Sequence, residues 1–95
     1  MRVISHKAIR QFGRKHADSI GALDAWYLVT KRATWSNLAE MKSDFPSADL
    51  VGGRTVFNIK GNTYRLIARV NHKSQKVFIL HILTHAEYDK GEWEQ

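Results

Sequence analysis

Residues 56–68 read VFNIKGNTYRLIA, and this stretch decides how the chain folds. Valine, isoleucine, phenylalanine and tyrosine, which favour strands, stand on both sides of Gly61-Asn62. Glycine and asparagine tolerate the positive φ that a tight turn between antiparallel strands requires. The sequence therefore predicts strands at residues 55–60 and 63–71, joined by a two-residue turn.

A third strand is predicted at residues 76–84, where valine, phenylalanine, isoleucine and leucine follow the polar turn 72–75. The three strands then form an antiparallel meander. If Lys60 faces Thr63 across the first turn, Asn58 lies opposite Arg65, and the alternation of side chains assigns each residue to one face.

One face of this meander is predicted to be apolar, and the other to be mixed and cationic. The apolar face holds Phe57, Ile59, Tyr64, Leu66, Ala68 and Val70, with Phe78, Leu80 and Ile82 from the third strand. The second face holds Asn58, Lys60, Arg65, Arg69, His81 and His85, together with Ile67, Ile79 and Leu83. We expect the apolar face to receive helices and the cationic face to bind RNA.

The N-terminal half is predicted to supply those helices. Apolar residues recur at helical spacing in residues 6–16 and 20–33, and the stripe with Leu23 and Trp26 can lie against a sheet. We also expect a short strand at residues 2–4, a helical piece at 37–43 and a loop at 47–53. The predicted fold class is α+β. N-terminal helices pack on one face of an antiparallel sheet with a C-terminal three-stranded meander, in a single domain of residues 1–95.

The composition of the chain limits its function. Fifteen lysines and arginines against nine acidic residues give a formal net charge of +6 in 95 residues. Such an excess points to a polyanion, either nucleic acid or an anionic membrane surface. The chain has no cysteine, which excludes a disulfide scaffold, a thiolate zinc site and a cysteine nucleophile. No apolar run reaches the length of a membrane span and residues 1–16 do not resemble a secretory signal, so we expect a cytoplasmic protein without a membrane partner.

Two segments of the chain resemble the HigB-type toxins of type II toxin–antitoxin systems. They are residues 56–68 and the run Thr84-His85-Ala86-Glu87-Tyr88-Asp89. The upstream segments WSNL at 35–38 and DFPSAD at 44–49 are similar to a connecting segment of the same family. The resemblance extends from residue 5 to about residue 90.

This resemblance implies a RelE-like fold and an enzyme that cleaves mRNA in the ribosomal A site. It also implies a neighbouring antitoxin, a helix-turn-helix protein of the HigA type, that neutralises the toxin. No metal site is predicted, because His6 and His16 are too far apart on one helix to share a metal. No small-molecule cofactor is expected.

The resemblance also assigns roles to single residues. Arg65, on the family's Tyr-Arg-Leu strand, takes the phosphate-stabilising role, and His85 takes the position at the end of the last strand. Tyr88 is the matching tyrosine, while the lysine of some relatives maps to Asn58 or Lys60.

These residue types suit metal-free cleavage of RNA, in which a 2′-hydroxyl attacks the phosphate and the 5′-oxygen leaves. An imidazole exchanges protons near neutral pH, so His85 is predicted to be the general acid or base. The guanidinium of Arg65 can clamp the phosphate with two hydrogen bonds. The predicted catalytic set is Arg65, His85, Tyr88 and Lys60, and the predicted RNA-binding set is Asn58, Arg69, His81 and Lys7.

The same residues also allow ordinary structural explanations. Arg65 could pair with Glu87 or Asp89 across the sheet, and His85 could cap the loop after the third strand. A non-catalytic RNA- or ribosome-binding module that uses the cationic face is therefore a second hypothesis. A membrane-surface protein is a third, disfavoured because no helix combines a strong apolar face with a basic one. Trp93, in the acidic tail, receives no predicted position.

Overall fold

Five strands form one sheet through the centre of the molecule, in a computed structural model that describes residues 1–94. The strands are β1 (Arg2–Ile4), β2 (Asp49–Val51), β3 (Arg54–Ile59), β4 (Tyr64–Asn71) and β5 (Lys76–Thr84). They pair in the order β1-β5-β4-β3-β2. Because β1 runs parallel to β5 and all other pairs are antiparallel, the sheet is mixed rather than antiparallel throughout.

The predicted meander is confirmed as β3, β4 and β5, with Asn58 opposite Arg65 as expected. The predicted loop at residues 47–53 is wrong, because residues 49–51 form β2. Gly52 and Gly53 both have positive φ, 57° and 80°, so they close a tight hairpin between β2 and β3.

The turn between β3 and β4 differs from the predicted two-residue turn. The loop covers residues 60–63, and the N–H of Thr63 donates to the carbonyl of Lys60 at 3.2 Å. The positive φ angles belong to Lys60 at 54° and Gly61 at 63°, not to Gly61 and Asn62. This displacement by one residue redirects the Lys60 side chain and leaves Asn62 inside the loop, two residues before β4 begins.

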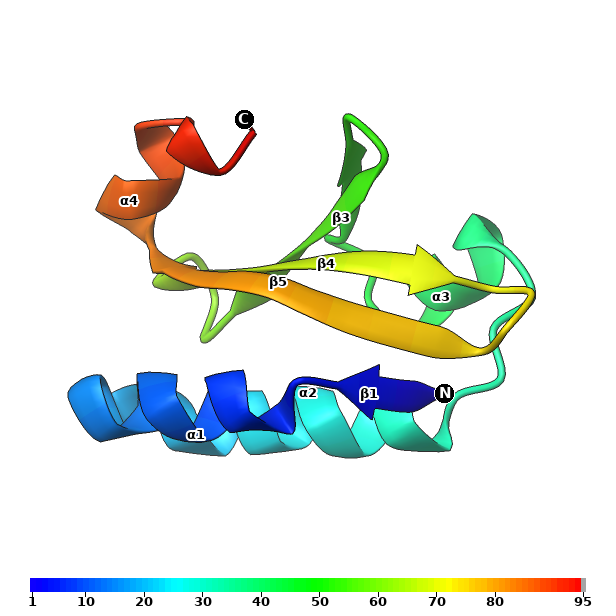
Figure 1. Ribbon diagram of the computed structural model, residues 1–95, viewed down its shortest axis with the longest axis horizontal. Helices are drawn as coiled ribbons and strands as arrows, with labels where there is room; N and C mark the ends of the chain where they lie inside the picture. The colour runs from blue at the N-terminus through cyan, green and yellow to red at the C-terminus, as the bar shows by residue number, and fades with distance from the viewer. Residues whose placement is uncertain (95) are drawn as a thin grey trace.

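The N-terminal helices cover one face of the sheet, which confirms the α+β class. They are α1 (His6–Lys15) and α2 (Ile20–Arg32), separated by the 3₁₀ turn η1 (Ala17–Ser19). Figure 1 shows α1 and α2 side by side on one side of β4 and β5, while α3 (Leu38–Asp44) lies near the turn that joins those strands. The main core forms between this helical layer and the sheet. It includes the buried residues Leu23, Trp26, Phe57, Ile59 and Leu66.

A bulge in β5 changes which residues meet the helices. Ile67 pairs with His81 but Ala68 pairs with Ile79, so Leu80 is an extra residue in the ladder. Ile79 consequently belongs to the main core, whereas Leu80 is 38% exposed. Phe78 lies opposite Arg69 on the second face. The predicted faces of Phe78 and Ile79 are therefore wrong, because the bulge interrupts the alternation on which they depend. Leu80 still lines a hollow with Ala8 and Phe12 of α1, on the side of the helices.

The second face of the sheet is covered at one end by the C-terminal segment. After β5 the chain forms the short helix α4 (His85–Asp89) and the 3₁₀ turn η2 (Glu92–Glu94), on the side opposite α1 and α2 (Figure 1). Trp93 is 5% exposed and forms a second buried cluster with Val56 and Ile67. Within residues 1–94 no helix has both the length and the apolar character needed to cross a membrane.

Candidate active site

Arg65 is a buried cation held by the backbone around it. Only 9% of the residue is exposed, and its guanidinium donates to the carbonyls of Asn62 at 3.0 Å and Tyr64 at 3.2 Å. A longer contact of 3.5 Å reaches Oδ1 of Asn62. The turn that ends at Tyr64 thus fixes the guanidinium in place.

The charge of Arg65 has no carboxylate partner within residues 1–94, so the alternative pairing with Glu87 or Asp89 is wrong. Glu87 bonds to Thr84, and Asp89 bonds to His85. A desolvated cation without a counter-ion is costly, and such groups concentrate at sites that bind an anion. The arrangement therefore makes Arg65 a candidate anion-binding group.

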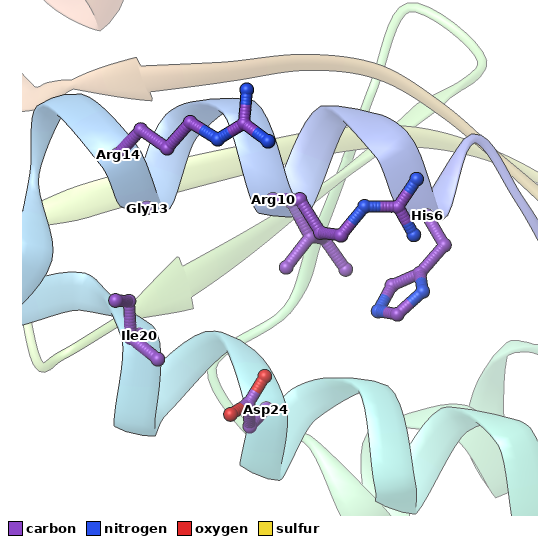
Figure 2. Close-up of a pocket in the computed structure, with 7 residues that line it drawn as sticks. His6, Arg10, Gly13, Arg14, Ile20 and Asp24 are labelled. Carbon is purple, nitrogen blue, oxygen red and sulfur yellow. The ribbon is translucent and has the colours of Figure 1, made fainter.

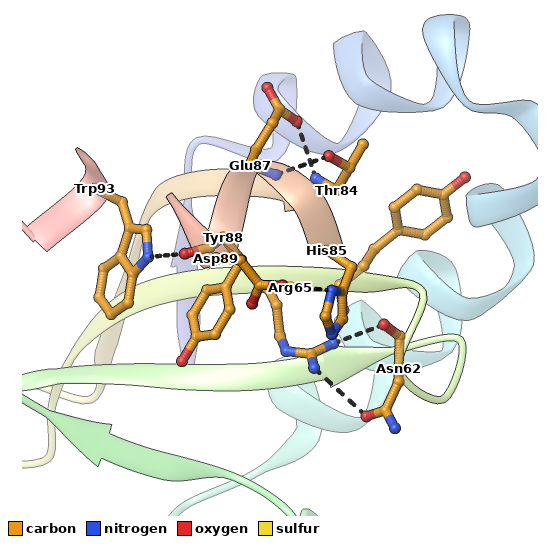
Figure 3. A network of polar contacts seen from close by, with 9 residues as sticks. Asn62, Arg65, Thr84, His85, Glu87, Tyr88, Asp89 and Trp93 are labelled. Carbon is orange, nitrogen blue, oxygen red and sulfur yellow. Dashed lines mark hydrogen bonds and ion pairs between the residues drawn. The ribbon is translucent and has the colours of Figure 1, made fainter. Parts of the chain in front are cut away.

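Tyr88 covers one side of Arg65. The guanidinium carbon lies 5.3 Å from the centroid of the tyrosine ring, within the range of a cation–π contact. The other partner of this ring is Trp93, stacked at 5.1 Å between centroids with 13° between the planes. Figure 3 shows Tyr88 between the Trp93 indole and the Arg65 guanidinium, with Asn62 beyond the guanidinium.

The side chain of His85 lies beside that of Asp89, one helical turn later. Nδ1 of His85 lies 3.0 Å from Oδ2 of Asp89, and the two side chains are 53% and 59% exposed. Because the carboxylate lies at Nδ1, Nε2 is the ring nitrogen left available for proton exchange with a ligand. The backbone N–H of His85 donates to the carbonyl of Thr63, so α4 begins against the turn that holds Arg65.

A capping box fixes the start of α4. The hydroxyl of Thr84 accepts from the N–H of Glu87, and Oε1 of Glu87 accepts from the N–H of Thr84 at 2.9 Å. This backbone hydrogen bond lowers the pKa of Glu87 below its usual value. The cap places His85 directly at the end of β5.

Three predicted RNA contacts lie on the face that carries Arg65. Asn58 is its half-buried neighbour on β3, and Arg69 is exposed further along β4. His81 is exposed beside a hollow of about 260 Å³ that Glu87, Lys90 and Trp93 also line. Arg69 and His81 are thus exposed on the face on which Arg65 itself is buried.

Lys60 and Lys7 are not brought together with Arg65. Nζ of Lys60 lies 2.7 Å from Oδ2 of Asp18, whose Oδ1 accepts from the Tyr64 hydroxyl. These hydrogen bonds lower the pKa of Asp18 and raise that of Tyr64. Because Tyr64 and Arg65 are consecutive strand residues, they point to opposite faces. The predicted face of Lys60 is therefore wrong, and Lys7 lies on α1 in the helical layer.

A separate hollow of about 340 Å³ lies between α1 and α2 (Figure 2). Its lining residues are His6, Ile9, Arg10, Gly13, Arg14, Ile20 and Asp24. None of the predicted site residues lines it. The helices come close together at Gly13, where an added Cβ would lie 2.9 Å from Cγ1 of Ile20.

Sequence reasoning missed three residues of the site, Asn62, Asp89 and Trp93. The pattern Thr84-x-x-Glu87 was a usable signal, because it is the capping box of a helix start. A helix from residue 85 would have placed Asp89 four residues after His85 on one face. Within residues 1–94 no three histidine, aspartate or glutamate side chains gather closely enough to hold a metal ion.

The fold and this site define a class of protein. The chain belongs to the HigB toxin family, the RelE-like toxic component of a toxin–antitoxin system, whose pattern matches residues 19–91. The mRNA interferase HigB of Escherichia coli O6:H1 is 36% identical over 93 residues, which cover 95% of this chain and 90% of the relative. The mRNA interferase toxin HigB of Escherichia coli K12 is 32% identical over 92 residues, covering 94% and 88%. The mRNA interferase HigB of Shigella flexneri shows the same identity and coverage.

Proposed function

We propose that this protein is a ribosome-dependent mRNA endonuclease that inhibits translation in the cytoplasm. The observation that carries the proposal is the buried guanidinium of Arg65, which has no carboxylate partner within residues 1–94 and lies by the turn against which His85 begins α4. The names of the relatives as mRNA interferases support the substrate class.

The proposed reaction needs no metal. A 2′-hydroxyl loses its proton and attacks the adjacent phosphorus, the bond from phosphorus to the 5′-oxygen breaks, and the 5′-oxygen leaves with a proton. The free N–H groups of Arg65 stabilise the charge that develops on the phosphate oxygens. His85 moves a proton through Nε2 as general acid or base while Asp89 holds the ring through Nδ1. Tyr88 keeps the guanidinium oriented and offers its hydroxyl edge to the RNA.

We infer two macromolecular partners besides mRNA. The ribosomal A site would present the mRNA, and a helix-turn-helix antitoxin of the HigA type would neutralise the toxin, as membership of a toxin–antitoxin family suggests. Residues 1–95 would act as one RelE-like toxin domain. The net charge of +6 favours association with the ribosome through long-range attraction to RNA.

The test is expression of the wild type, Arg65→Ala and His85→Ala, with mapping of new mRNA 5′ ends and sedimentation with ribosomes. We expect the wild type to arrest growth and produce new ends. His85→Ala should still sediment with ribosomes but produce none, while His72→Ala, in the turn between β4 and β5, serves as a matched histidine control.

The alternative binding module makes a different prediction. In that case both site variants would weaken ribosome association in proportion to lost charge, and no variant would change mRNA ends. A wild type that neither arrests growth nor creates new ends would remove the toxin proposal.

A further inference from the structure

Trp93 lies beyond residues 19–91, the part of the chain that the family pattern matches, yet it is almost fully buried. Its indole packs against Val56 and Ile67 on the sheet. Its backbone carbonyl accepts a hydrogen bond from the guanidinium of Arg54 on β3. The tail is therefore attached to the sheet at Trp93 by both a side-chain and a backbone contact.

Tyr88 depends on this attachment. It lies on α4, a helix of five residues in which no residue is buried. A helix this short is not stable through its own hydrogen bonds, so outside contacts must fix its side chains. Trp93 provides two of them: the ring stack, and a hydrogen bond of 3.0 Å from its Nε1 to the carbonyl of Tyr88.

Tyr88 in turn contacts Arg65. Its ring stacks on the indole, and the same ring lies 5.3 Å from the guanidinium carbon. A chain of contacts thus runs from the buried indole through the tyrosine to the charged group (Figure 3). Trp93 itself forms no hydrogen bond with Arg65 within residues 1–94 and can affect it only through Tyr88 and the packing of the tail.

We propose that Trp93 is a positioning residue of the RNA-cleaving site. It holds the ring of Tyr88 in place over Arg65 and so keeps the guanidinium in the orientation that binds the phosphate. The inference rests on the proposed function in so far as that function assigns Arg65 and Tyr88 to the reaction. Misplacing a reacting group by about 1 Å can cost about a hundredfold in rate, so the loss of this contact should lower kcat strongly.

The test compares Trp93→Ala and Trp93→Phe with wild type in two measurements on the whole protein. The first is the set of nuclear Overhauser contacts between the Tyr88 ring and the Arg65 side chain. The second is the rate of mRNA cleavage on ribosomes, resolved into kcat and KM. The matched control is Met41→Ala, which removes a fully buried side chain on α3, an element outside the site.

We expect Trp93→Ala to lose the contacts between Tyr88 and Arg65 and to reduce kcat by about 10- to 100-fold, with KM changed less than about threefold. Trp93→Phe keeps an aromatic ring, so it should restore the contacts and most of kcat. Met41→Ala should lower the melting temperature while leaving both measurements unchanged below that temperature.

Two results would overturn the inference. One is a Trp93→Ala variant that is folded and retains both the contacts and kcat. The other is a Trp93→Phe variant that is folded, keeps the ring contacts and is nevertheless as inactive as Trp93→Ala. If Trp93→Ala does not fold, the phenylalanine variant decides alone. If the proposed function is wrong, the wild type will show no cleavage, which is a separate result. The Overhauser contacts would then still test whether Trp93 positions Tyr88.

Discussion

The surroundings of Arg65 suit an anionic ligand. Backbone carbonyls accept from its guanidinium and an aromatic ring covers it, but no carboxylate among residues 1–94 neutralises it. Attraction to a phosphate is stronger in such a site than at the surface, because little water screens the charge. Lysine would keep the charge but lose the planar fork that both the carbonyls and a phosphate use.

Arg65→Lys should therefore lower the cleavage rate about 100-fold, the magnitude seen when one preorganised donor to a developing oxyanion is removed. The measurement is the initial rate of mRNA cleavage in a ribosome-dependent translation extract. Arg69→Lys, on the same strand but exposed, is the control and should retain most of the rate. Equal rates for both variants would mean that Arg65 acts only through its charge.

At this scale the sequence was informative about Arg65 but not about Lys60. Alternation along a strand predicts a face correctly as long as the residue belongs to the strand, as Asn58 and Arg65 do. Lys60 is in the left-handed region with φ of 54°, which ends the alternation one residue early. The pairing of Lys60 with Asp18 joins residues far apart in the chain, and no local pattern announces it.

Among the helices and strands, α4 depends most on contacts at its two ends to keep its conformation. It has five residues and none is buried, so the capping box of Thr84 and Glu87 and the stack on Trp93 hold it. The capping box could be read from the sequence, whereas the bulge at Leu80 could not. An extra residue leaves no mark in residues 77–83, where six of the seven side chains are apolar and His81 alone is polar.

The cap of α4 should weaken in acid. Because the pKa of Glu87 is lowered in the folded protein, its stabilisation is fully present above the ordinary glutamate range and is lost progressively as pH falls through the lowered pKa of the folded state. Amide hydrogen exchange in α4 should then accelerate relative to β4. Glu87→Gln should remove most of this pH dependence, and an unchanged pH profile in that variant would show that another group is responsible.

The two helical glycines provide a matched pair for the helical layer. Gly21 has open space where a Cβ would lie, with no atom within 4 Å, and no positive φ. Gly21→Ala should therefore stabilise the fold by about 0.5 kcal/mol through helix propensity. Gly13→Ala should not, because its Cβ would lie 2.9 Å from Cγ1 of Ile20 and displace that side chain. Thermal unfolding of both variants measures the difference, and equal stabilisation would contradict the close approach of α1 and α2.

On the scale of the whole molecule, positive charge lies on both sides of the sheet. Arg10 and Arg14 belong to the helical layer, while Arg69 and Lys90 lie on the side of Arg65. The net charge of +6 therefore does not by itself identify the RNA-binding side. The layers and the family could be predicted from the sequence, but only the path of the tail shows that the cationic face is partly covered.

Two double variants with the same change in net charge can identify the binding side. Arg69→Gln with Lys90→Gln should reduce the salt dependence of binding to a 2′-O-methylated single-stranded RNA, lowering the log–log slope by about 1.4 for two lost phosphate contacts. Arg10→Gln with Arg14→Gln should leave the slope unchanged. The reverse outcome would move the RNA to the helical layer.

The residues that build and support the site, from Arg54 to Trp93, lie in one continuous stretch of chain. The family pattern begins at residue 19, so α1 lies outside it. Exchange of α1 between relatives would alter the outer surface and charge of the helical layer, Lys7 included, and hence what binds there, without replacing Arg65, His85 or Tyr88. A chimera carrying a foreign α1 that keeps Ile9 and Gly13 would retain the same chemistry behind a new surface.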